Sequence, residues 1–257
     1  MDKVLCEMIN QNLSYKIIKD EEDNIMVKLR PKSIIANLQG KFNPNDIEIG
    51  GIAVQQRLEL NNIRTDLYRQ CLNSPCTITD KSPFKSIPQG QPDAKIMFIN
   101  DSPSDYEMYS MTSCSDKEGV FLSIIIDKLK PYLDSKNIST NQIYYTDIVK
   151  CNNVTSDECN YCINRYLKKE IDIIKPKLII CNGINTLYSI ANAGIIENLP
   201  TSIDYGNIYT VTTPTGLYFN IIAINNLNEI LQKDGNEYTQ WKNILWRQMV
   251  TAVNSIT

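Results

Sequence analysis

Short apolar runs alternate with helical patterns over most of the chain. Continuous apolar runs predict buried strands at residues 95–99, 142–149, 177–181 and 217–224. Apolar residues recur at helical spacing over 119–133, 161–174, 184–193 and 237–253. Residues 205–213 are expected to pair with 217–224 as a hairpin around Pro214-Thr215-Gly216. Because strands and helices alternate, the pattern predicts an α/β fold, three-layer αβα, with a mainly parallel central sheet.

The first part of the chain has a different rhythm. Residues 14–18 and 25–29 are short apolar runs around a charged turn, which predicts a β-hairpin. A Gly- and Pro-containing loop is expected at 41–46, followed by a helical pattern over 47–70. We therefore predict an appendage of hairpin and helix over residues 1–65, and the main domain over 66–257.

Composition narrows the class of protein. Of the 257 residues, 42% are hydrophobic and 21% are charged, as in ordinary globular proteins. No apolar run approaches the roughly 20 residues of a membrane span, and acids interrupt the apolar start, unlike a secretory signal. We therefore expect an intracellular protein, in cytoplasm or nucleoid, or in the nucleus or at a replication site for a viral source. The net charge is −3, so a nucleic-acid binder would need a local basic patch.

Polar side chains follow each of the predicted strands. Asn100-Asp101-Ser102-Pro103 follows the first, Asp147 lies in the second, Asn182 follows the third and Asn225-Asn226 the fourth. Ligands of open α/β sheets bind beyond the carboxyl ends of the strands, so these loops predict a crevice. Taken singly, each loop is more typical of turns and helix caps, and it is the convergence of four such loops that favours a crevice.

The cysteines form a second group, in a chain without any histidine. Cys71 and Cys76 lie in a polar loop, Cys151 follows the second main strand, and Cys162 opens the next helix with Cys159 one turn earlier. Four thiolates suit zinc or an iron–sulfur cluster. Ordinary buried thiols are the other interpretation, which explains Cys6, Cys114 and Cys181 well.

In their order these motifs resemble the uracil-DNA glycosylase superfamily, most closely its iron–sulfur family 4, over residues 66–250. The most specific stretch is 144–151, similar to the family's Tyr-x-Thr-Asn-x-Val-Lys-Cys; residues 100–104 stand in the place of Gly-Glu-Ala-Pro-Gly. The resemblance implies a structural [4Fe–4S] cluster on Cys71, Cys76, Cys151 and Cys162, with Cys159 as the substitute for Cys162. It also implies base contacts by Pro103, by Phe121, whose ring would stack on a flipped base, and by the residue at position 147.

The departures from the family fall on the residues that do chemistry. Asn225 stands where the family has the histidine that stabilises the leaving base, and it cannot become a cation. Asp147 replaces the uracil-reading asparagine, and an ionised carboxylate only accepts hydrogen bonds. Asp101 keeps a carboxylate in place of glutamate, whereas both glycines of the first motif are lost. Phe121 has a second interpretation as a core aromatic at the start of a helix.

Three hypotheses follow. The first is a catalytically impaired protein that binds single- or double-stranded DNA, or a replication or transcription partner through the N-terminal appendage. The second is an active glycosylase with altered base choice, in which Asp147 reads the base and Asp101 orients water. The third is a thiolate–zinc α/β protein with no role on nucleic acid.

Overall fold

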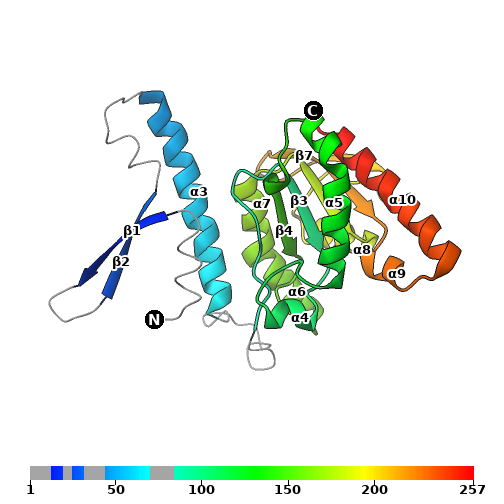
Figure 1. Ribbon diagram of the computed structural model, residues 1–257, viewed down its shortest axis with the longest axis horizontal. Helices are drawn as coiled ribbons and strands as arrows, with labels where there is room; N and C mark the ends of the chain where they lie inside the picture. Colours follow the sequence, from blue (N-terminus) through cyan, green and yellow to red (C-terminus); the bar gives the residue numbers. More distant parts are fainter. Residues whose placement is uncertain (1–12, 20–24, 32–43, 70–83) are drawn as a thin grey trace. The chain divides into compact units, whose positions relative to one another are not determined.

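In the computed structural model of the chain, residues 13–19, 25–31, 44–69 and 84–257 are described (Figure 1). They belong to two compact units, Met1–Gln56 and Arg57–Thr257. The first unit contains the hairpin, in which β1 (Leu13–Lys19) pairs antiparallel with β2 (Ile25–Pro31). Helix α3 (Pro44–Tyr68) begins there, within the stretch predicted as a loop. Proline is compatible with the first turn of a helix, because that turn's N–H groups lack intrahelical partners.

The second unit is built on a five-stranded sheet in the order β4-β3-β5-β7-β6. Its strands are β3 (Ile96–Asn100), β4 (Ile143–Asp147), β5 (Leu178–Asn182), β6 (Ile208–Thr212) and β7 (Tyr218–Ile224). Strands β4, β3, β5 and β7 run parallel, and β6 pairs antiparallel with β7 as the predicted hairpin. The prediction of a mainly parallel sheet is therefore confirmed.

Helices cover both faces of this sheet (Figure 1). Alternate residues of β3 enter different cores: Ile96 and Phe98 pack with α5 and α10, whereas Met97 and Ile99 pack with the helices of the other face. The helices are α4 (Asp105–Tyr109), α5 (Lys117–Ser135), α6 (Ser156–Cys162), α7 (Lys168–Ile174), α8 (Ile184–Asn192), α9 (Leu227–Leu231) and α10 (Gly235–Asn254). A 3-10 turn, η2 (Thr140–Gln142), precedes β4, and a turn of π-helix, η3 (Ile163–Leu167), joins α6 to α7. The three-layer αβα fold is confirmed. No helix in the described ranges is long and apolar enough to cross a membrane.

The last turns of α3 belong to the second unit. Leu60, Ile63 and Leu67 of α3 are buried in the core beneath β3 and β5. The second unit begins at Arg57. The predicted division into an appendage over 1–65 and a main domain over 66–257 stays a prediction.

Candidate functional site at the carboxyl edge of the sheet

The ends of the parallel strands meet through their polar side chains. Asn100 and Asp147 are register partners at the ends of β3 and β4. Asn182, at the end of β5, donates from Nδ2 to Asn100 Oδ1 at 2.8 Å and to Glu118 Oε2 at 3.2 Å. The backbone N–H of Leu227, beyond β7, donates to Asn182 Oδ1 at 2.8 Å. The Asn182 side chain therefore connects the end of β5 to the end of β3 and to the loop after β7.

Asp147 is enclosed at this edge, with no solvent-exposed surface. The hydroxyls of Ser86 and Ser113 each donate to its Oδ2 at 2.7 Å, whereas Oδ1 is buried without a hydrogen-bond donor in the described residues. Burial raises the pKa of Asp147, although Lys150 and the two serines oppose the rise. A base could reach this carboxyl group only after the segment carrying Ser86 or Ser113 moved away.

A buried ion pair that the sequence did not reveal lies behind Asp147. Lys150 Nζ is 2.9 Å from Glu170 Oε1, donates to the Asp147 carbonyl at 2.8 Å and also donates to Thr146 Oγ1. The Thr146 hydroxyl donates to Glu170 Oε2 at 2.6 Å. Both charged side chains are almost completely buried, so the attraction between them must offset the cost of removing each charge from water. The pair joins the end of β4 to α7, directly before Cys151.

Glu107 is a second buried carboxyl group that sequence reasoning missed. Its Oε2 accepts from the backbone N–H of Ser104 at 2.8 Å, and its Oε1 accepts from the backbone N–H of Cys114. Burial, reinforced by the charge of Asp147, raises the pKa of Glu107 to about 7. The available signal was the Ser-x-x-Glu spacing of a capping box, which Ser104 and Glu107 form at the start of α4.

Asp101 is exposed just beyond β3. With Asn153, Cys159 and Asn192 it lines a polar pocket of about 520 Å³ between the loop after β4 and helices α6 and α8. Partial burial raises the pKa of Asp101. Pro103, two residues further on, is buried, and its predicted contact with a base stays a prediction.

Phe121 lies in the first turns of α5 and is buried in the core. Its ring centroid is 6.5 Å from that of Tyr238 on α10. This packing favours its interpretation as a core aromatic. Position 119, in the same helix, requires glycine for steric reasons, because a Cβ there would lie 1.9 Å from the Cys114 carbonyl oxygen.

Asn225 follows β7 and is held by Gln248 of α10. The Asn225 N–H donates to Gln248 Oε1 at 2.9 Å, and Gln248 Nε2 donates to Asn225 Oδ1 at 2.5 Å. The side-chain oxygen of Asn225 is therefore occupied within the protein. Of the residues predicted for catalysis and base contact, Asp101 alone is exposed; Pro103, Phe121, Asp147 and Asn225 are buried.

Three of the cysteines predicted as ligands lie in the described part of the chain. Cys151 and Cys162 are buried, whereas Cys159 is half-buried and lines the polar pocket beside Asp101. Cys71 and Cys76 lie outside the described residues, as does Cys6. No group of three or more potential metal ligands occurs within the described residues.

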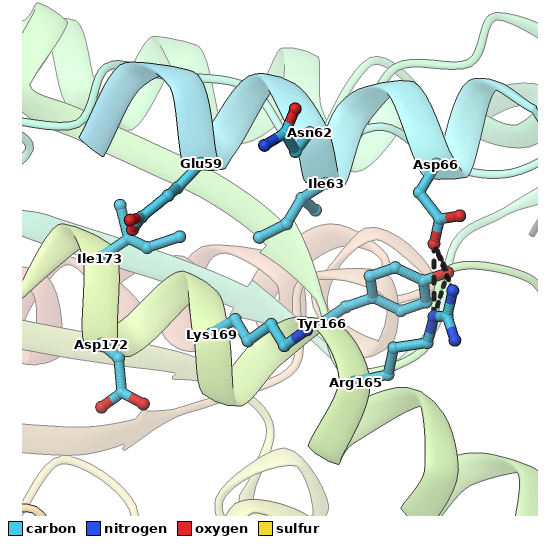
Figure 2. Close-up of a pocket in the computed structure, with 9 residues that line it drawn as sticks. All are labelled: Glu59, Asn62, Ile63, Asp66, Arg165, Tyr166, Lys169, Asp172 and Ile173. Carbon is cyan, nitrogen blue, oxygen red and sulfur yellow. Dashed lines mark hydrogen bonds and ion pairs between the residues drawn. The ribbon is translucent and has the colours of Figure 1, made fainter. Parts of the chain in front are cut away.

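The turn of π-helix that follows Cys162, η3, is anchored to α3 (Figure 2). Asp66 accepts from Arg165 Nη2 at 2.9 Å and from the Tyr166 hydroxyl at 2.6 Å. Burial raises the pKa of Asp66, but the hydrogen bonds from Tyr166 and Arg165 outweigh it and leave the pKa below its usual value. A groove of about 520 Å³ runs beside this contact, between Glu59 and Asn62 of α3 and Lys169 of α7. The contact fixes the end of α3, from which the chain continues to Cys71.

In a three-layer α/β fold, ligands bind in a crevice beyond the carboxyl ends of the parallel strands, where this chain carries its polar side chains. The Uracil DNA glycosylase superfamily matches residues 87–249, and the chain belongs to this superfamily. It is also similar to the Type-4 uracil-DNA glycosylase of Sulfurisphaera tokodaii, with 33% identity over 102 residues, which are 37% of this chain. The match spans 42% of that relative's length, less than half of it.

Proposed function

We propose that this protein is a superfamily member with severely impaired uracil excision, which acts as a binding partner in DNA replication, transcription or repair. The observation that carries the proposal is the enclosure of Asp147. The residue at the base-reading position has no exposed surface, and two serines already occupy one of its oxygens. A site that must receive a flipped base needs this position open.

Two chemical reasons support the loss of activity. The uracil edge presents both donors and acceptors, whereas an ionised carboxylate offers only acceptors. The chain contains no histidine, and the Asn225 oxygen is already bonded to Gln248, so no cationic imidazole is available to stabilise the departing base. Losing such preorganised stabilisation typically costs about 10²–10³ in rate.

We also propose that Cys71, Cys76, Cys151 and Cys162 hold a structural [4Fe–4S] cluster, with zinc as the alternative. Thiolates are the ligands of such clusters, and histidine ligation is excluded by composition. The burial of Cys151 and Cys162 supports their inclusion. Cys159 fits less well, because it lines a polar pocket instead.

The test is an excision assay on oligonucleotides that carry uracil, cytosine, a 5-substituted pyrimidine or a mismatch. Alkali cleavage reveals abasic sites, and we expect none above the protein-free blank. The double variant Asp147→Asn, Asn225→His restores the family's residues and serves as the gain-of-function arm. Abasic product from the wild type that disappears in Asp101→Asn would overturn the proposal and establish the active glycosylase with altered base choice.

A further inference from the structure

The loops beyond the parallel strands carry mostly acidic side chains. We call one set of these the acidic rim: Asp101, Asp105, Asp116, Glu118 and Asp157. Lys117 is the only basic residue within 100–118 and 151–158. Asn152 Nδ2 donates to Asp105 Oδ1 at 2.6 Å and thereby joins the loop after β4 to α4. Asp116 caps α5, on which Glu118 lies.

Exposed aromatic rings lie beside the rim. We call Phe84, Tyr106 and Tyr109 the aromatic patch; their exposed fractions are 36%, 63% and 75%. Tyr106 and Tyr109 are three residues apart on α4, directly after Asp105, and the ring of Phe84 is 5.7 Å from that of Tyr109. Exposed aromatic rings that lie close together are typical of an interaction surface, because leaving them in water does not stabilise the folded chain.

Three lysines lie at the opposite edge of the sheet. Lys95 precedes β3, and Lys175 and Lys177 precede β5, so they lie at the amino ends of the strands. Lys177 Nζ donates to the Thr257 carbonyl at 2.7 Å. The acidic side chains of the rim do not attract phosphate, which carries the same sign of charge.

We propose that the acidic rim and the aromatic patch form a docking surface for a lysine- and arginine-rich segment of a partner protein. The occupant follows from charge complementarity: carboxylates attract the cationic groups, and tyrosine faces bind them by cation–π contact. Single-stranded nucleic acid could stack on the same rings, but its phosphates would meet the rim's negative field. This inference rests on the proposed function, because it names the partner class of the same non-excising edge.

The test uses the full chain and two fluorescein-labelled probes, a nona-arginine peptide containing one tryptophan and an oligothymidylate of similar length. Fluorescence anisotropy is recorded at about 0.05 and 0.15 M salt, where screening of surface charge differs. We expect the peptide to bind, and to bind more weakly at higher salt. Tyr106→Ala and Tyr109→Ala should each weaken binding about two- to fivefold, the size of an exposed cation–π contact. The double variant Asp105→Asn, Asp157→Asn should weaken it as well.

Matched controls separate this surface from general attraction to an acidic protein. Tyr218→Ala removes a tyrosine that is 67% exposed at the start of β7, and Asp134→Asn removes an exposed acid paired with Lys130. Both should bind the peptide like the wild type. Equal weakening by the controls, absence of peptide binding, or tighter binding of the oligothymidylate that is lost in Tyr106→Ala would each overturn the inference. Abasic product in the excision assay would instead overturn the proposed function. The peptide titration does not depend on that assay, so the two failures can be told apart.

Discussion

Gln248 on α10 bonds Asn225 twice, through the Asn225 backbone N–H and the Asn225 side-chain oxygen. The two residues are 23 positions apart, and both are buried. The loop after β7 is therefore held by the last helix. The position where the superfamily resemblance implies a catalytic histidine has become part of this protein's internal packing.

Gln248→Ala should destabilise the protein by about 1–3 kcal/mol, because it leaves the buried polar groups of Asn225 without partners. Urea unfolding followed by circular dichroism measures the change. Gln240→Ala, on an exposed position of the same helix, is the matched control and should change stability by less than about 0.5 kcal/mol. Equal effects of the two substitutions would contradict the role assigned to Gln248.

Lys150→Met should destabilise the protein by about 3–5 kcal/mol, since it leaves Glu170 as a buried charge without its cation. The double variant Lys150→Met, Glu170→Leu should recover part of this loss, because it removes both charges. Lys130→Met breaks the exposed pair with Asp134 and should cost no more than about 0.5 kcal/mol. A double variant no more stable than the single one would argue against the ion-pair explanation.

Glu107 should make stability fall as the pH rises from about 4.5 to about 7. Its pKa is raised in the folded state to about 7, so the folded protein binds a proton more tightly than the unfolded chain does. This contribution is complete below the unfolded pKa and is lost as the pH rises through the folded pKa, with a slope of at most about 1.4 kcal/mol per pH unit. Urea midpoints at several pH values measure it. Glu107→Gln should flatten that part of the profile, whereas the exposed control Glu237→Gln should leave it unchanged.

Phe121→Ala should destabilise the protein by about 3–5 kcal/mol, as truncation of a buried aromatic does. Val120→Ala, at the exposed neighbouring position, should cost much less. Thermal and urea unfolding of the two variants and the wild type measure the change in stability. A Phe121→Ala protein as stable as the wild type would return this ring to the base-stacking role that the sequence suggested.

The cluster proposal predicts iron in the protein purified without oxygen, with broad absorption near 400 nm. Cys151→Ser and Cys162→Ser should lose the iron, whereas Cys159→Ser should retain it. Iron and zinc are quantified by elemental analysis on matched samples. Zinc in place of iron would establish the alternative metal, and equal iron in all three variants would exclude Cys151 and Cys162 as ligands.

Parts of the candidate site were accessible from the sequence alone. The polar residues after the strands were visible because a buried strand that ends in Asn or Asp breaks an apolar run, as at Asn100 and Asn182. The Ser-x-x-Glu spacing could have revealed Glu107. Nothing local could have revealed that Ser86 bonds Asp147, because 61 residues separate them.

The sequence by itself determined the alternation of strands and helices, the polar carboxyl edge, the absence of any imidazole and the superfamily. These are properties of short-range periodicity and residue type, which hold in any arrangement of the elements. Only the tertiary structure decided that Asp147 is enclosed, that Gln248 occupies Asn225 and that Phe121 belongs to the core. Those outcomes depend on which distant side chains the parallel sheet brings together, and pairing across the fold leaves no periodic trace along the chain.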